Sequence, residues 1–370
     1  MNSKVIERDV KESSMKAPVK EQQEGAKINR RYKVNSRAGV GGLGLVEIVD
    51  DTCLDRPIAL KVMHKEHANN KMSRDSFLGE AVVTARLQHP NIVPVYDVGL
   101  IQGKSIPYYT MKLIEGESLH EILAQVSERE PTYLESYGRN RLINIFREVC
   151  EAVSYAHSKG IVHSNIKPSN IMIGEFGEVL LTDWELAKSR DGKEVAIPGN
   201  EDCFLTDYKS FNNDQCEVNV EGSLAYLAPE QALGLSESVD EQTDVFLLGA
   251  TLYHILTFRP PYDMDDPIDS ISKAERTDFI HPRKLNACRD VPNALIDIMM
   301  KAMDLQKAAR FKTVEEMANA IELYLSGEHV SKSSTVPPGT VLLREGDTDK
   351  ETFILVSGIV DVMVTMDGQP

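Results

Sequence analysis

The sequence contains no apolar stretch long enough to cross a bilayer. Its longest apolar run, residues 245–258, is shorter than a membrane span and is interrupted by His254, so we expect a buried core helix there. The first 26 residues include no apolar h-region, and a secretory signal is therefore not predicted. Because they mix Lys and Glu with few apolar residues, we expect residues 1–28 to form a disordered arm.

Cysteine is scarce and positive charge is in deficit. Five scattered cysteines form no close metal-ligand pair: Cys53, Cys150, Cys203, Cys216 and Cys288. Their odd number favours free thiols in a reducing, cytoplasmic compartment over a disulfide framework. The 41 Lys and Arg face 57 Asp and Glu, and this excess of acid argues against nucleic-acid or membrane binding by this chain. The length of 370 residues gives room for two or three folded units.

A glycine-rich run follows the arm. Gly39, Gly41 and Gly44 occupy its first, third and sixth positions, a spacing that lets backbone amides approach phosphate oxygens. A dinucleotide-binding loop has the same spacing but continues into a helix. Here strand patterns lie on both sides, at residues 32–34 and 47–49, so we expect the glycines to join two antiparallel strands.

One lysine interrupts the apolar strand predicted at residues 58–62. A lone lysine such as Lys61 is often an edge residue. Further along, however, Glu80 lies in a helical stretch, residues 77–83. A strand lysine paired with a helix glutamate orients the α- and β-phosphates of ATP in kinases. Another strand is predicted at residues 108–111.

In this order and spacing, these elements resemble the N-terminal lobe of the eukaryotic-like serine/threonine protein kinases of bacteria. The resemblance implies an ATP site whose adenine is enclosed by three apolar side chains, those of Val46, Ala59 and Met172. It also implies that the backbone of Lys112 and Ile114 bonds the adenine edge and that Met111 lies at the back of the pocket.

Residues 163–170 read His-Ser-Asn-Ile-Lys-Pro-Ser-Asn and resemble the catalytic loop of that family. An active loop carries Asp where this chain carries Asn165. A carboxylate can accept a proton from a substrate hydroxyl, whereas an amide cannot. By resemblance, Lys167 neutralises the transferring phosphoryl group, and Asn170 holds a metal ion.

Residues 183–185, Asp-Trp-Glu, take the place of the metal-binding Asp-Phe-Gly turn, and Asp183 is implied to bind Mg²⁺. We expect Glu185 to strain a backbone that glycine adopts freely. Three interpretations of Glu185 stay open: a locked turn, a metal ligand and a solvated acid. Ser164 stands where an arginine usually pairs with a phosphorylated loop, so control through that pair is not expected.

The segment from Asp183 to Glu230 is long, and its middle, residues 200–221, is polar and acidic. It is interpreted either as a mobile insertion or as an interaction element. Residues 222–230 resemble the substrate-docking end of this segment. By resemblance, Asp244 braces the catalytic loop, and Arg310 pairs with Glu230 in a structural role.

The tail carries strand patterns at residues 353–358 and 360–365 that resemble the opening of a cyclic-nucleotide-binding domain. The chain stops before the phosphate-binding cassette of that family, so we expect a fragment that does not bind a cyclic nucleotide. An unrelated hairpin cap is the alternative.

The predicted fold is therefore α+β: a bilobal protein kinase followed by the first strands of a barrel-like domain. We expect an arm (1–28), a β-rich N-lobe (29–115), a helical C-lobe (116–328) and a linker with the truncated segment (329–370). ATP and Mg²⁺ are the implied cofactors. The first functional interpretation is a pseudokinase that binds ATP and an unknown partner protein. The alternatives are an active serine/threonine kinase and a binding module that needs no nucleotide.

Overall fold

The computed structural model describes residues 27–190, 224–262, 266–285 and 290–327, with Pro337 and Thr340. It divides into two compact units. The sheet unit contains residues 27–74 and 95–113, and the helical unit contains residues 75–94 and the described residues from 114 onward. Most of the predicted arm, the acidic middle of the long segment with Cys203 and Cys216, Cys288, and nearly all of the tail lie outside the described residues.

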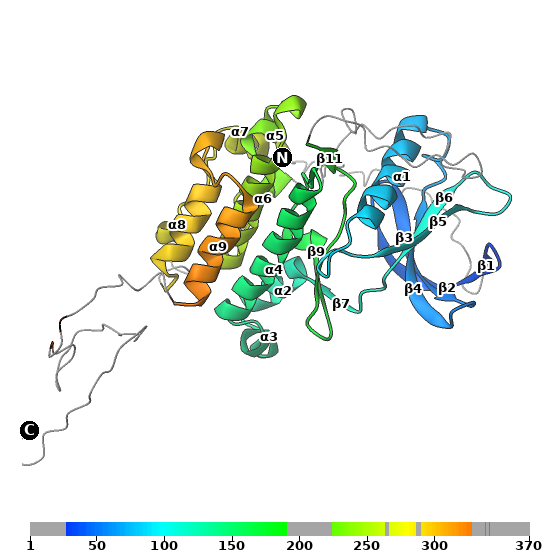
Figure 1. The fold of residues 1–370 in the computed structure, drawn as a ribbon, viewed down its shortest axis with the longest axis horizontal. Coiled ribbons are helices and arrows are strands. Elements are labelled where there is room, and N and C mark those ends of the chain that lie inside the picture. Colours follow the sequence, from blue (N-terminus) through cyan, green and yellow to red (C-terminus); the bar gives the residue numbers. More distant parts are fainter. Residues whose placement is uncertain are drawn as a thin grey trace, which may run out of the picture. The chain divides into compact units, whose positions relative to one another are not determined.

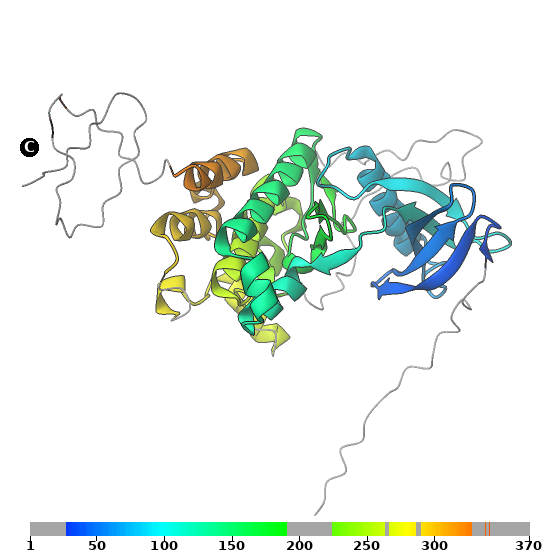
Figure 2. The same ribbon diagram turned by 90° about the horizontal axis from the view of Figure 1, so that it is seen from below.

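The sheet unit is built on antiparallel strands (Figure 1). Its described strands are β1 (Lys27–Ile28), β2 (Tyr32–Val40), β3 (Gly44–Asp51), β4 (Arg56–Met63), β5 (Val95–Leu100) and β6 (Pro107–Met111). They form one sheet in the order β1-β2-β3-β4-β6-β5, drawn in blue to cyan (Figures 1 and 2). Strands β2 and β3 pair antiparallel around the glycine-rich run, as predicted, and β2 extends further than predicted, to Val40.

The helical unit begins within α1 (Lys71–Arg86), whose first residues belong to the sheet unit. Its other described helices are α2 (Leu119–Ser127), α3 (Pro131–Ser136), α4 (Arg139–Ser158), α5 (Pro229–Ala232), α6 (Glu241–Thr257), α7 (Pro267–Glu275), α8 (Asn293–Ala302) and α9 (Val314–Leu325). Short strands β7 (Gly116–Ser118), β9 (Ile171–Gly174) and β10 (Val179–Leu181) form an antiparallel sheet, and β8 (Ile161–Val162) pairs with β11 (Lys188–Ser189). The described 3₁₀ turns are η1 (Pro168–Asn170), η3 (Leu224–Tyr226), η4 (Ser236–Ser238), η5 (Pro282–Lys284) and η7 (Lys307–Ala309).

The predicted core helix is confirmed as α6, which is buried from Thr243 to Thr257. The carboxylate of Asp240 caps its N-terminus by accepting a hydrogen bond from the backbone amide of Gln242. The helix ends at Thr257, and its C-cap residue Phe258 adopts a left-handed conformation with φ of 56°. Because the helix starts at Glu241, Asp244 lies in its first turn rather than at its start.

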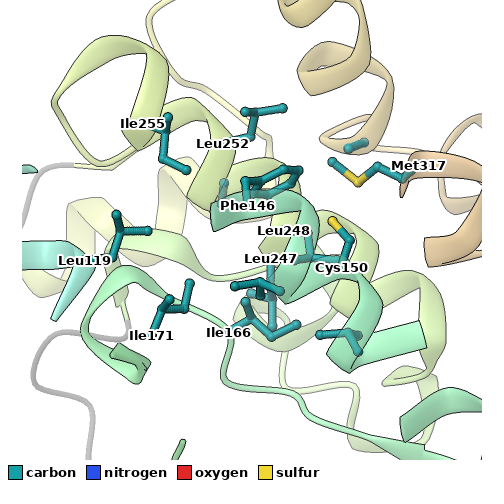
Figure 3. Close-up of a cluster of buried hydrophobic side chains, with 14 of the residues drawn as sticks. Leu119, Phe146, Cys150, Ile166, Ile171, Leu247, Leu248, Leu252, Ile255 and Met317 are labelled. Carbon is teal, nitrogen blue, oxygen red and sulfur yellow. The ribbon is translucent and has the colours of Figure 1, made fainter. Parts of the chain in front are cut away.

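The core of the helical unit is where α4, α6 and α9 meet (Figure 3). Phe146 and Cys150 of α4, Leu248 and Leu252 of α6, and Met317 of α9 converge there, and their burial from water supplies much of the stability of the unit. Cys150 is a free thiol whose pKa is raised by burial, so it is an inert packing group. Among the described helices, none has the length and apolarity that a bilayer crossing requires.

Candidate functional site

Strand register aligns several residues of the predicted ATP site within the sheet unit. Gly39 lies opposite Val46, and Val46 lies opposite Lys61. Ala59, two residues before Lys61 on β4, lies opposite Met111 of β6. Directly paired residues share a face of a sheet, as do residues two apart on a strand. Val46, Ala59, Lys61 and Met111 therefore occupy the same face.

The glycine-rich turn is closed by its own backbone. The Gly41 amide donates to the Gly44 carbonyl at 2.8 Å, and the His64 ring lies 3.1 Å from the Gly41 carbonyl oxygen. Gly39 has no positive φ, and a Cβ added there would meet no atom within 4 Å. The fold itself therefore does not require glycine at position 39. A glycine that lets a ligand approach the backbone would show this pattern. Sequence reasoning missed His64, which no local pattern marks.

Other predicted nucleotide residues belong to the helical unit or to its border. Glu80 is buried in the part of α1 that belongs to the helical unit, Met172 lies on β9 opposite Leu180, and Ile114 precedes β7. Lys112 directly follows β6 in the sheet unit. The pairing of Lys61 with Glu80 and the enclosure of adenine involve both units, and they stay predictions.

The predicted brace of the catalytic loop is confirmed. The fully buried Asp244 carboxylate accepts hydrogen bonds from the backbone amides of His163 and Ser164, both at 2.8 Å. It also lies 2.8 Å from Nε2 of His157, at the end of α4. One side chain of α6 thereby fixes the entry to the loop.

Ser164 adopts a left-handed backbone conformation, with φ of 64°. Its carbonyl accepts a hydrogen bond from the Gln231 side chain at 2.8 Å, which links the loop to α5. Its hydroxyl is buried and makes no hydrogen bond within the described residues. The position is therefore used through its backbone, in line with the predicted loss of an arginine function.

Asn165, Asn170 and Asp183 are brought together. The Asn165 side-chain amide donates from Nδ2 to Oδ2 of Asp183 at 3.0 Å. Nδ2 of Asn170 donates to the Asn165 carbonyl at 2.8 Å, and the Asn170 carbonyl accepts from the backbone and hydroxyl of Thr182 at 2.9 and 3.1 Å. The catalytic loop and the Asp183 turn are thus one hydrogen-bonded assembly.

The expected backbone strain at Glu185 is wrong. Among the described non-glycine residues with positive φ is Asp183, at 63°, but not Glu185. The turn places its left-handed residue two positions earlier, where an aspartate tolerates it better than most residues. Trp184 is fully buried, with its ring centroid 4.4 Å from that of His163.

Lys167 shares its surroundings with two acids. Burial lowers the pKa of Lys167 below its ordinary value, while the charges of Asp183 and Glu185 act in the opposite direction. Glu185 therefore adds negative charge near the lysine that the family uses for the phosphoryl group.

The residues present fit a magnesium ion. Mg²⁺ in phosphate-transfer sites takes one or two protein oxygens together with phosphate oxygens and water. Because Nδ2 of Asn170 is used on Asn165, its Oδ1 remains for a cation, and Asp183 supplies a carboxylate. No cluster of three or more His, Cys, Asp or Glu suited to a metal occurs among the described residues.

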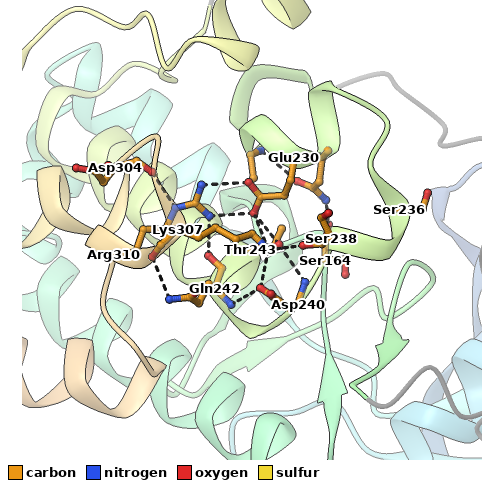
Figure 4. A network of polar contacts seen from close by, with 12 residues as sticks. Ser164, Glu230, Ser236, Ser238, Asp240, Gln242, Thr243, Asp304, Lys307 and Arg310 are labelled. Atoms are coloured by element: carbon orange, nitrogen blue, oxygen red, sulfur yellow. Dashed lines mark hydrogen bonds and ion pairs between the residues drawn. The ribbon is translucent and has the colours of Figure 1, made fainter.

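The predicted Glu230–Arg310 pair is confirmed (Figure 4). NH1 and NH2 of Arg310 bond both carboxylate oxygens of Glu230, at 2.9 and 3.0 Å, and both residues are buried. Thr243 donates to the same carboxylate at 2.7 Å. Burial would raise the pKa of Glu230, but the bonds and charge of Arg310 outweigh it and lower the pKa.

The end of the long segment is anchored by a buried histidine. The Tyr226 hydroxyl lies 2.7 Å from Nδ1 of His254, and the Ala225 carbonyl accepts from the Tyr262 amide at 3.2 Å. Burial, helped by the charge of His120, lowers the pKa of His254 to about 3. His254 is therefore neutral, and its Nδ1 shares a hydrogen bond with the Tyr226 hydroxyl. The sequence marked this residue only as a polar break in an apolar run.

A two-unit fold with a glycine-rich hairpin and a loop braced by a buried aspartate is characteristic of a protein kinase. The chain belongs to this family, since the protein kinase domain matches residues 32–320. It is serine/threonine kinase-like: it is 34% identical over 304 residues to serine/threonine-protein kinase PknD of Protochlamydia amoebophila (strain UWE25), covering 80% of this chain and 30% of that protein.

PknD of Chlamydia trachomatis serovar D (strain ATCC VR-885 / DSM 19411 / UW-3/Cx) is 33% identical over 306 residues, covering 81% of this chain and 32% of the relative. The chain thus spans about a third of the length of these relatives. The crystal structure of the Mycobacterium tuberculosis PknI kinase domain superposes with a TM-score of 0.56 at 24% identity, covering 82% of this chain and 99% of that chain. The predicted kinase fold and bacterial serine/threonine kinase family are confirmed.

Proposed function

We propose that this chain is a pseudokinase: it binds ATP, transfers the γ-phosphate weakly or not at all, and serves a partner protein in the cytoplasm as a regulatory or scaffolding module. One observation carries the proposal. The loop is fully braced by Asp244, yet the residue at the base position is an amide. Because an amide accepts no proton at neutral pH, the loop lacks a general base.

ATP binding is proposed on two grounds. Residues that the family uses to bind nucleotide share one face of the sheet unit. The fold also leaves room for a side chain at Gly39, so packing does not require glycine there. When Mg²⁺ accompanies the nucleotide, Asn170 and Asp183 would hold it, and the ion would neutralise phosphate charge. The predicted boundaries of the lobes, 29–115 and 116–328, belong to the same proposal.

An active serine/threonine kinase is the second candidate, and Lys167 with Asp183 favours it. Phosphoryl transfer depends mainly on positioning and charge neutralisation, so a missing base does not abolish it. Loss of a general base costs about 10²–10⁴ in rate. An active kinase would turn over at about 1–100 s⁻¹.

The test is transfer of labelled γ-phosphate to a generic serine/threonine acceptor by the wild type and by Asn165→Asp. We expect no wild-type transfer above background. Transfer at ordinary kinase rates would overturn the proposal. Asn144→Asp makes the same chemical change on α4, where the side-chain amide bonds the Asn140 carbonyl, and it is the matched control.

ATP binding is measured separately, by thermal unfolding with and without ATP. Ligand at a hundredfold its Kd adds about 2.7 kcal/mol to the free energy of unfolding. Lys61→Met should reduce this gain without unfolding the protein. If ATP leaves the wild-type melting temperature unchanged at millimolar concentration, the nucleotide-free binding module replaces the pseudokinase.

A further inference from the structure

We propose that Asn165 is a positioning residue that clamps Asp183, so that the 183–185 turn keeps its conformation without a divalent cation. Nucleotide binding by this chain is then independent of Mg²⁺. The second statement rests on the ATP binding proposed above, whereas the clamp itself does not.

The chemistry of the two side chains fixes the direction of the hydrogen bond between Asn165 and Asp183. A carboxylate only accepts, so an Asn165 oxygen facing Asp183 would place two acceptors 3.0 Å apart. The amide NH₂ must therefore face Oδ2 of Asp183. A donor to an ionised acceptor makes a stronger bond than a neutral pair does. Asn165 is only 9% exposed, so water competes little for this bond.

Further hydrogen bonds fix the backbone beside both residues of this clamp, Asn165 and Asp183. The Asn165 backbone amide donates to Nδ1 of His163 at 3.2 Å, and Nε2 of the same ring lies 3.2 Å from the Thr182 carbonyl. If Nδ1 accepts, then Nε2 carries the hydrogen and donates to Thr182. Thr182 precedes Asp183 and is also bonded to the Asn170 carbonyl. The clamp therefore closes a ring of hydrogen bonds around the turn.

The backbone of Asp183 adopts a conformation that other contacts must stabilise. Asp183 sits at φ of 63°, a region that side chains other than glycine enter at an energetic cost. Such a conformation persists only where surrounding contacts determine it. The Asn165 bond is a contact of this kind, and it is made by the protein alone.

A carboxylate at position 165 would interact with Asp183 differently from the amide. An Asp at position 165 would put two negative oxygens at about this separation, and their repulsion would need a cation or a shared proton between them. With Asn165, the amide hydrogen takes the place of that cation in positioning Asp183. The substitution that removes the base thus also removes a need for metal.

The clamp is tested without nucleotide. Melting temperatures are measured for the wild type, Asn165→Asp and the control Asn144→Asp, in EDTA and in excess Mg²⁺. We expect Asn165→Asp to melt roughly 5 °C lower than the wild type in EDTA and to recover with Mg²⁺, because it loses a bond to a charged group. The wild type and the control should not respond to Mg²⁺. Equal melting of the wild type and Asn165→Asp in EDTA would refute the clamp.

A measurement on the wild type alone covers the case in which Asn165→Asp does not fold. Amide hydrogen exchange of residues 182–187 should have the same rate in EDTA and in Mg²⁺. Slower exchange in Mg²⁺ would mean that the cation, rather than Asn165, holds the turn.

Nucleotide binding is then compared in the two buffers. We expect Kd values for ATP that agree within about twofold. Binding at least tenfold tighter with Mg²⁺ overturns cation independence and leaves the pseudokinase proposal standing. Absence of ATP binding in both buffers overturns both the ATP binding and its cation independence, while the measurements without nucleotide still decide the clamp.

Discussion

The sheet unit and the helical unit position their functional residues by different means. In the sheet unit, backbone pairing between neighbouring strands places Val46 beside Lys61 and Ala59 beside Met111. In the helical unit, buried side chains reach over long sequence distances, as Asp244 does to the amide of His163. The first kind of placement tolerates changes of side chain, whereas the second concentrates stability in a few polar groups.

The largest expected effect is in the helical unit. Arg310→Met leaves the Glu230 carboxylate buried without its main partner, and loss of one member of a buried pair costs about 3–5 kcal/mol. Urea unfolding should show this loss in the free energy of unfolding. Arg147→Met, which removes more exposed pairs with Glu151 and Glu322, should cost less than about 1 kcal/mol. Similar values for the two variants would contradict the comparison.

The next effect is acid sensitivity of the helical unit. The pKa of His254 is about 3 in the folded chain and 6.5 as its ordinary value, so the unfolded chain binds a proton that the folded one does not. This contribution is complete above pH 6.5 and is lost as the pH falls toward 3, by up to about 1.4 kcal/mol per pH unit. His254→Gln keeps an acceptor for Tyr226 and should flatten the pH dependence between pH 6 and 4.

Among the described residues, the titratable side chains of His120 and Tyr226 face His254. Burial also lowers the pKa values of His89 and His163, which act in the same direction, so the variant should reduce the slope without abolishing it. An unchanged slope in His254→Gln would show that His254 titrates freely in the folded protein.

A pair of glycine substitutions compares the two units directly. An added Cβ at Gly116 of β7 would lie 2.0 Å from the Ile173 carbonyl oxygen of β9, so Gly116→Ala must move the backbone and should cost about 2 kcal/mol. Gly39→Ala should change the free energy of unfolding by less than about 1 kcal/mol but weaken ATP binding. Chemical denaturation and calorimetry measure the two effects. A stable Gly116→Ala variant would show that β7 can shift.

The smallest expected effect is a gain in the sheet unit. Glu47 is buried on β3, its Oε2 makes no hydrogen bond within the described residues, and burial raises its pKa although Arg37 opposes this. At pH 7 the charged form is penalised, so Glu47→Gln should stabilise by about 1 kcal/mol. The gain should shrink as the pH falls through the raised pKa of Glu47, because the carboxyl group is then protonated and carries no charge penalty. Glu66→Gln, on an exposed turn, is the control and should be neutral.

The sheet unit was largely predictable because its information is local. The glycine spacing, the following strand and the lysine within an apolar run predicted the hairpin around Gly39–Gly44 and strand β4. In the helical unit, the core helix α6 and the Glu230–Arg310 pair were also predicted, the first from its apolar run and the second from family resemblance.

The contacts at the reaction centre were not predictable. The sequence identified Asn165 as a missing base, but not as a donor to Asp183, because the direction of an amide depends on atoms that meet only after folding. Strain was expected at Glu185 and occurs at Asp183, since the turn's backbone is set by its hydrogen bonds rather than by the residue that differs from the family pattern. Gln231 and His254 find partners 67 and 28 residues away, beyond any local periodicity.

Asp244 grips the catalytic loop through the backbone amides of residues 163 and 164, and every amino acid except proline supplies such an amide. The conformation at the start of the loop therefore depends on backbone groups, whereas the chemistry of the loop depends on side chains. A change of side chain at position 164 can therefore leave this brace in place. A kinase fold can thus change residues beside its reaction centre while the backbone of the loop stays in position.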